Sequence, residues 1–201
     1  MANSNRPAGL VPVKNLNGAV WNGQANVYSI AASYGTALAV GDPVISSGTS
    51  DANGIQGIVI AGATGAIRGV IVGLGIAEGG IFNPNNLNII YRPANDPAEW
   101  FALVVDDPNV IFEIQEHANG TQLAAAQCGK NQVMVSGANN GYVSGWQLAS
   151  MTDAPAATTA TLPLRLLGLS RRADNAFGAN AKWLVQINVH ELGHGTGASG
   201  V

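Results

Sequence analysis

Short runs of apolar residues, separated by glycine-rich turns, predict a protein built mainly of β-strands. Apolar and polar residues alternate along 183–189 and along 112–116. A strand with this period of two buries one face and leaves the other in water. Counting such runs, we expect strands at residues 26–32, 37–40, 44–46, 55–61, 67–76, 100–106, 110–116, 132–135, 142–149, 162–169 and 182–190.

Turn sequences divide these strands at short intervals, which is typical of a small barrel or meander. Gly41-Asp42-Pro43 and Asp51-Ala52-Asn53-Gly54 are two examples. Residues 81–97 hold three prolines and five asparagines, so we place a boundary between two lobes inside this segment. Helix is expected to be minor, limited to a turn near residues 98–101 or 123–127.

The pattern therefore predicts a mainly β fold with two small lobes and an extended arm at each end. Residues 1–20, with their prolines and the Asn15-Leu16-Asn17-Gly18 stretch, form the N-terminal arm. Residues 21–95 form a glycine-rich barrel- or meander-like lobe, and residues 96–190 form a β-sandwich- or jelly-roll-like lobe. Residues 191–201 are rich in Gly, Ser and Ala and form a flexible tail.

The composition predicts a surface with few charged residues. Charged residues make up 10% of the 201 residues, against roughly 25% in average soluble proteins. The surface must then consist largely of Ala, Gly, Asn, Ser and Thr, and we expect much of it to contact another protein. Hydrophobic residues make up 47%, which excludes a disordered chain.

Several classes of partner and site are excluded by the same counts. Nine Lys and Arg, spread along a chain of net charge -3, give no basic patch for nucleic acid. No apolar run approaches the roughly 18 residues of a membrane-spanning helix, and the N-terminus lacks the order of a signal peptide. The single cysteine, Cys128, excludes an internal disulfide and a multi-cysteine metal site. We expect a chain of intracellular origin.

The motif His190-Glu191-Leu192-Gly193-His194 matches the H-E-x-x-H pattern of zinc proteases, and Gly197 extends the match. In those enzymes the two histidines lie one helical turn apart and bind one metal ion. Here an alternating strand runs directly into the motif, and three glycines disfavour a helix. The position of the third histidine is Gly200, no carboxylate follows Glu191, and His117 is distant. We interpret the motif as a strand end, and predict no catalytic, cofactor-binding or metal-binding residues.

Other candidate sites are weaker. Asp106, Asp107, Glu113 and Glu116 could supply a glycosidase pair, but their spacing sends neighbours to opposite faces of a strand. We expect a turn and a solvated face there. Glycines 73 and 75 are similar to a dinucleotide loop, yet Glu78 occupies the third glycine position. Cys128 is expected to be a small buried or edge residue.

The aromatic residues offer a possible stacking platform for sugars. Trp100 and Trp183 lie in predicted strands and are expected in the core, whereas Trp146 follows a turn and is expected to be the most exposed. The full aromatic set considered is Trp21, Trp100, Trp146, Trp183, Tyr28, Tyr34, Tyr91 and Tyr142.

Three segments carry a resemblance to a known group of proteins. The first contains Val-Val-Asp-Asp-Pro-Asn at 104–109 with Phe-Glu-Ile-Gln-Glu at 112–116, and the second is Gly-Trp-Gln-Leu at 145–148. The third extends from Leu164 to Gly178 and through Lys-Trp-Leu-Val-Gln-Ile-Asn-Val-His at 182–190. Together they resemble small β-rich head decoration, or cement, proteins of tailed bacteriophages. The resemblance is strongest over 100–190.

The resemblance implies a non-enzymatic protein that binds the outer surface of an expanded phage capsid and stabilises the shell against DNA pressure. Its expected partners are the major capsid protein and other copies of itself, in a dimer or trimer. Nucleic acid, membrane and cofactors are not expected. The protein would be made in the bacterial cytoplasm and reside on the virion.

Two alternatives stay open. The nearer one is another virion component, such as a tail, baseplate or head-fibre part with or without glycan binding. The more remote one is a zinc metalloprotease that uses the motif at 190–194. Within the decoration hypothesis, residues 1–20 and 191–201 are the arms that engage capsid subunits or neighbouring copies.

Overall fold

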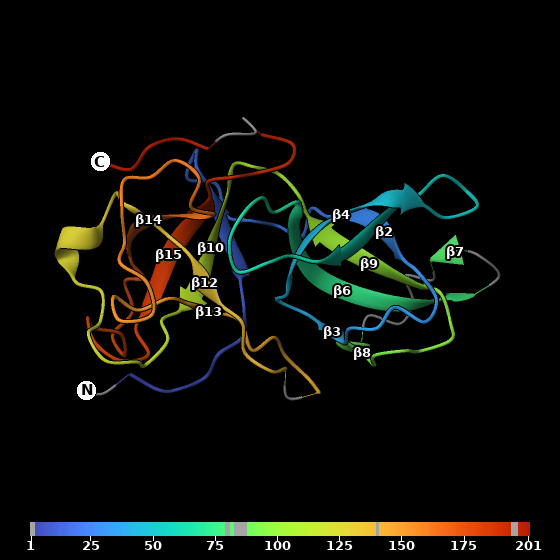
Figure 1. Ribbon diagram of the computed structural model, residues 1–201, viewed down its shortest axis with the longest axis horizontal. Helices are drawn as coiled ribbons and strands as arrows, with labels where there is room; N and C mark the ends of the chain where they lie inside the picture. Colours follow the sequence, from blue (N-terminus) through green and yellow to red (C-terminus); the bar gives the residue numbers. More distant parts are fainter. Residues whose placement is uncertain (1–2, 79–80, 83–87, 140, 194–196) are drawn as a thin grey trace.

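The computed structural model describes residues 3–78, 81–82, 88–139, 141–193 and 197–201. These residues form β-strands in several sheets and one short 3₁₀ helix, η1 (Ala125–Gln127), so the prediction of a mainly β fold is confirmed. Two lobes lie side by side along the long axis of the molecule (Figure 1). Among the residues described, no helix is long and apolar enough to cross a membrane.

The first lobe is a small closed barrel. Its strand order is β4 (Pro43–Ser50), β5 (Gln56–Ile60), β2 (Asn26–Ile30), β9 (Trp100–Val105) and β6 (Gly69–Glu78). Pairing between β4 and β6 closes the sheet on itself, which removes exposed strand edges. Apolar side chains fill the interior, among them Ile30, Leu38, Val44, Ile58, Leu74 and Val104.

Two short ribbons flank the barrel. The strand β7 (Ile81–Phe82) pairs with the end of β6, and β3 (Leu38–Ala39) pairs with β8 (Tyr91–Arg92). The fully buried Arg92 fastens the second ribbon, because its guanidinium donates to the carbonyl oxygens of Tyr34 at 3.1 Å and Pro93 at 3.0 Å.

The second lobe is an open antiparallel sheet. Its order is β1 (Val11–Asn15), β10 (Val110–Gln115), β15 (Lys182–Ile187), β14 (Leu164–Leu169) and β11 (Asn131–Gln132). A second, two-stranded sheet is formed by β12 (Met134–Val135) and β13 (Gln147–Leu148). Along β15 every second residue is buried, as the alternation in the sequence predicts. Met134 and Leu148 belong to the same core as Trp183, so the two sheets enclose one apolar layer.

The two lobes share that core. One cluster of buried apolar side chains contains Ile67, Val70 and Val105 from the barrel together with Phe112 and Val185 from the second lobe. In addition, Ile67 forms a parallel bridge with His190, and its amide donates to the carbonyl oxygen of Val189 at 2.9 Å. The lobes are therefore joined by packing and by backbone hydrogen bonds.

The lobe boundary predicted near residue 95 is wrong. The strand β9, at residues 100–105, pairs with β2 and β6 inside the barrel. The chain crosses to the second lobe later, at the Asp107-Pro108-Asn109 turn between β9 and β10. The Pro- and Asn-rich segment at 81–97 instead connects strands of the barrel, so turn composition alone misplaced the boundary.

The N-terminal segment is packed, contrary to the prediction of a free arm at 1–20. Residues 11–15 form β1, which pairs with β10, and Leu10 is buried between the lobes at 1% exposure. Pro12 is tolerated because β1 is an edge strand of its sheet, where a missing amide donor costs little. The pairing partner lies about a hundred residues away, which no local pattern reveals.

The described part of the C-terminal segment is also tied to the second lobe, whereas the sequence predicts a flexible tail at 191–201. The carbonyl oxygen of Ala198 accepts hydrogen bonds from Asn131 and Arg165, both at 2.8 Å. Gly200 donates to Thr158 at 3.0 Å and Val201 to Gly129 at 3.1 Å. The small residues that indicate a tail here permit close approach, because a Cβ at Gly197 would lie 2.2 Å from the oxygen of Ala160.

Most predicted strands are confirmed, whereas β1, β7 and β8 are not among them. Only residues 147–148 of the expected strand at 142–149 are extended in a sheet. The expected helical turn near 123–127 is η1, whereas the candidate at 98–101 runs into β9.

Candidate functional site

The described part of the H-E-x-x-H motif, residues 190–193, lies in a bridge and a turn and not on a helix. The strand β15 ends at Ile187, His190 bridges to Ile67, and the amide of Gly193 donates back to the carbonyl of His190 at 3.0 Å. His190 is 2% exposed, and its Nδ1 accepts the amide hydrogen of Leu192 at 3.0 Å. Burial lowers the pKa of His190. His194 lies outside the described residues.

The side chain of Glu191 links the two lobes. Its Oε2 accepts the amide of Ser46, on β4 of the barrel, at 3.1 Å and lies 3.7 Å from Nη1 of Arg68. A general base of a zinc protease would instead face a metal-bound water. Within the described chain no group of three His, Cys, Asp or Glu residues is placed to hold a metal ion.

A partly buried polar network surrounds Arg68 at the junction of the lobes. Its Nε donates to the Tyr28 hydroxyl at 3.0 Å, and that hydroxyl donates to Oδ2 of Asp106 at 2.6 Å. Asn26 also donates to Asp106, at 2.8 Å. Burial, and then the bond to Asp106, raise the pKa of Tyr28. Asp106 is 7% exposed, so the prediction of a turn and solvated face is wrong for this residue.

The other predicted acids are separated by their partners. Asp107 caps the turn as predicted, since its Oδ1 accepts the amide of Asn109 at 2.8 Å. Glu113 accepts from the Ser170 hydroxyl at 2.6 Å and pairs with Arg172. These acids hold structure together at different places.

Glu116 is fully buried, which contradicts the prediction of a solvated face. Its carboxylate accepts the amide of Leu123 at 2.6 Å and the indole N–H of Trp183 at 2.9 Å. Burial raises the pKa of Glu116 to about 7, although both hydrogen bonds oppose this shift. Glu116 directly follows β10 and continues the alternation of Phe112 and Ile114, so it lies on the buried face although its side chain is charged.

A His–Asp–Ser cluster on the second lobe lacks the order of a hydrolytic triad. Asp153 is central: His117 Nδ1 lies 2.9 Å from its Oδ2, and the Ser150 hydroxyl donates to the same atom at 2.9 Å. In a triad the histidine lies between the serine and the acid. Burial would raise the pKa of Asp153, but hydrogen bonds from Asn119, Ser150 and His117 outweigh it and lower the pKa to about 2.

Two further sequence candidates also lie in structural positions. Gly73 and Gly75 are within β6 and pair with β9, so they do not form a dinucleotide loop. Cys128 follows η1 and is exposed, whereas a buried or edge position was expected.

The tryptophans divide into three buried residues and one half-buried residue. Trp100 at 4% and Trp183 at 0% exposure lie in the core as predicted. Trp146 is 6% exposed, so the prediction that it is the most exposed is wrong. Trp21 lies in the loop before β2. It is partly buried against the core and also lines a groove.

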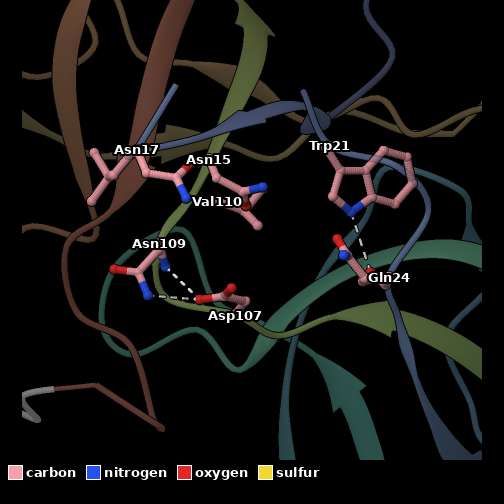
Figure 2. A pocket seen from close by; sticks show the side chains of 8 residues that line it. Asn15, Asn17, Trp21, Gln24, Asp107, Asn109 and Val110 are labelled. Carbon is pink, nitrogen blue, oxygen red and sulfur yellow. Dashed lines mark hydrogen bonds between the residues drawn. The ribbon is translucent and has the colours of Figure 1, made fainter. Parts of the chain in front are cut away.

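This groove, here called the Trp21 groove, has a volume of about 540 Å³. It runs between the N-terminal hairpin, formed by β1 and residues 16–20, and the turn at 107–109 that links the lobes. Figure 2 shows Trp21 and Gln24 on one side and Asn15, Asn17 and Val110 on the other. The lining residues are Asn15, Leu16, Asn17, Trp21, Gln24, Asp107, Asn109 and Val110.

Backbone hydrogen bonds fix the walls of the Trp21 groove. Leu16 donates to the carbonyl of Asn109 at 2.9 Å, and Asn15 donates to the carbonyl of Ala19 at 2.8 Å. The indole Nε1 of Trp21 donates to the carbonyl of Gln24 at 3.2 Å, which orients the ring. The groove therefore has a preformed shape.

Comparisons with known proteins return no match: neither a family model, nor a curated protein, nor a solved structure is similar to this chain.

Proposed function

We propose that this chain is a non-enzymatic structural protein of a tailed-bacteriophage virion, which binds the outside of the capsid and stabilises the shell. The observation that carries the proposal is a surface poor in charge. The sequence holds 9 Lys and Arg and 12 Asp and Glu. Four of these charged residues, Asp42, Arg92, Asp106 and Glu116, are buried. The outer surface is thus even less charged than the composition indicates.

Exposed apolar side chains support the same proposal. Val20 is 77% and Tyr142 is 67% exposed, and further examples are Val11, Leu16, Ile76, Phe177 and Leu192. A protein that stays single in solution is usually protected by mixed surface charges, whereas neutral surface with apolar side chains favours association. We expect the major capsid protein and other copies of the chain to cover part of this surface.

The terminal segments are ordered, so the hypothesis that they act as free arms must be changed. Since residues 11–15 and 197–201 are hydrogen-bonded to the second lobe, they would contact a capsid as parts of an ordered surface. Val20, which follows the hairpin turn and bridges to Lys14, is 77% exposed and is a natural contact point.

The test uses heads of the phage whose genome encodes this chain. Heads that lack the protein are mixed with the purified chain and sedimented, and the temperature of DNA release is measured. We expect saturable binding and a higher release temperature. Val20→Asp is expected to weaken binding. Thr158→Asp is the charge-matched comparison, because Thr158 is exposed in the loop beside β11, the edge strand opposite β1. If the chain sediments with tails and never with heads, the alternative virion role is correct.

Light scattering and elemental analysis of one purified sample give a faster first result. A metal-free dimer or trimer agrees with the assembly role. A monomer with one zinc ion per chain contradicts it and favours the metalloprotease alternative.

A further inference from the structure

The Trp21 groove has the chemistry of a site for a neutral, hydroxyl-rich ligand. Its eight lining residues include one carboxylate, from Asp107, and no Lys, Arg or His. Without a cation, such a groove repels phosphates and other anions. Its volume of about 540 Å³ lies within the roughly 300–1,000 Å³ of small-molecule sites.

Several polar side chains that line the groove have donors or acceptors without a hydrogen-bond partner in the described chain. The side-chain amides of Asn15 and Gln24 have no internal partner, and Asp107 uses only Oδ1, toward Asn109. Asn17 accepts the amide of Ala19 through Oδ1, so its NH₂ group is left for a ligand. Planar amides and a carboxylate can both donate to and accept from the hydroxyls of one ligand.

Apolar surface completes the groove. The indole of Trp21 is held by its bond to Gln24 and by packing on the core, and Leu16 and Val110 add aliphatic contacts. A rigid aromatic side chain can cover the apolar face of a ligand with little loss of entropy, while the amides bind its polar edge. Sugar rings combine such a C–H face with a rim of hydroxyls.

We infer that the Trp21 groove binds a neutral oligosaccharide built of hexose or N-acetylhexosamine units. The inference is independent of capsid binding, because it concerns a different ligand class and is tested on the purified chain alone. The aromatic side chain expected to contact the sugar is thus Trp21 and not Trp146, which is buried.

The test is a panel of neutral trisaccharides: maltotriose, cellotriose, mannotriose and triacetylchitotriose. Saturation-transfer NMR detects binding, and tryptophan fluorescence locates it, since Trp100, Trp146 and Trp183 are buried. We expect at least one trisaccharide to bind with a Kd of about 1 mM or tighter and to protect Trp21 from acrylamide quenching.

Variants separate the groove from the rest of the surface. Trp21→Ala is expected to weaken binding at least about tenfold, and Gln24→Ala about threefold, by NMR titration. Gln24→Ala removes an exposed side chain without an internal hydrogen bond, so it leaves the fold intact. Gln147→Ala, on β13 outside the groove, is the matched control and is expected to bind like the unmodified chain.

The inference is overturned if no trisaccharide of the panel binds at about 10 mM, or if Gln24→Ala and Trp21→Ala bind as tightly as the unmodified chain. It is also overturned if the groove proves to hold a second copy of the chain. In that case sedimentation would show self-association that Trp21→Ala abolishes and that trisaccharides do not change.

Discussion

At the residue scale, the junction between the lobes depends on two glycines whose backbones touch. Gly9 and Gly41 have φ values of 65° and 94°, and the amide of Leu10 donates to the carbonyl of Gly41 at 3.0 Å. A Cβ at Gly41 would lie 2.1 Å from the carbonyl oxygen of Ala8. Any larger side chain must separate the N-terminal segment from the barrel.

Gly41→Ala is therefore expected to lower the free energy of unfolding by about 3 kcal/mol or more, from left-handed strain and steric clash together. Gly23→Ala is a matched control, since Gly23 has the same φ of 94° but no atom within 4 Å of the added Cβ. It should cost only the strain, about 1 kcal/mol. Urea unfolding of both variants checks this, and equal losses would show that the contact is unimportant.

Glu116 gives the folded state a pH-dependent stability. Its pKa is raised from 4.5 to about 7 by burial, so the folded state binds more protons than the unfolded state between these values. The resulting stabilisation is fully present below pH 4.5 and is lost as pH rises through 7, by up to roughly 3 kcal/mol. We expect the urea midpoint to fall over this range.

In Glu116→Gln this part of the pH dependence should disappear. The difference between the variant and the unmodified chain is the quantity to measure, because the lowered pKa of His190 gives a slope of the opposite sign. A variant with the same pH profile as the unmodified chain would show that Glu116 does not titrate there.

Sequence reasoning located few of the functional candidates at this scale, for a physical reason. It placed Trp183 in the core because strand alternation is a local property. It named Glu116 and Trp21 as candidates but did not predict the surroundings of either side chain, because distant parts of the chain create them. Leu123 and Trp183 surround the acid, and the 107–110 turn lies beside the indole. The available hint was the concentration of Asn, Gln and Trp between residues 15 and 24.

At the scale of elements, the strand β1 is held in place by Leu10 and by its pairing with β10. Leu10 is 1% exposed, whereas Leu16, just beyond β1, is 48% exposed. Leu10→Ala is expected to cost about 2–5 kcal/mol, as for other buried leucines, and Leu16→Ala less than about 0.5 kcal/mol. Thermal unfolding checks both values. A small effect of Leu10→Ala would mean that the N-terminal segment is a loose arm after all.

Strands were predictable where their pattern is local, and lobe membership was not. The alternation in β10 and β15 and the turn glycines between strands are readable along the chain. The assignment of β9 to the barrel and of β1 to the second sheet depends on pairing between residues far apart, such as Asn26 with Val104 and Val11 with Glu113. Hydrophobic periodicity carries no information about such partners.

At the scale of the whole molecule, the shared core predicts that both lobes unfold in one cooperative transition. Trp100 reports on the barrel and Trp183 on the second lobe, once the other three tryptophans of each variant, including the buried Trp146, are replaced by Phe. The two fluorescence midpoints in urea should coincide with the loss of β-sheet circular dichroism. Two separate midpoints would show that the lobes are independent domains.

The crossing at the 107–109 turn has a consequence for how the chain folds as it is synthesised. Every strand of the closed barrel lies between residues 26 and 105, so the barrel is complete before the second lobe has left the ribosome. The strand β1 emerges before the barrel strands, yet its partner β10 follows them and itself pairs with β15, about seventy residues later. Such long-range pairing is slow to form. The strand β1 is therefore synthesised before every strand of the barrel and paired after them.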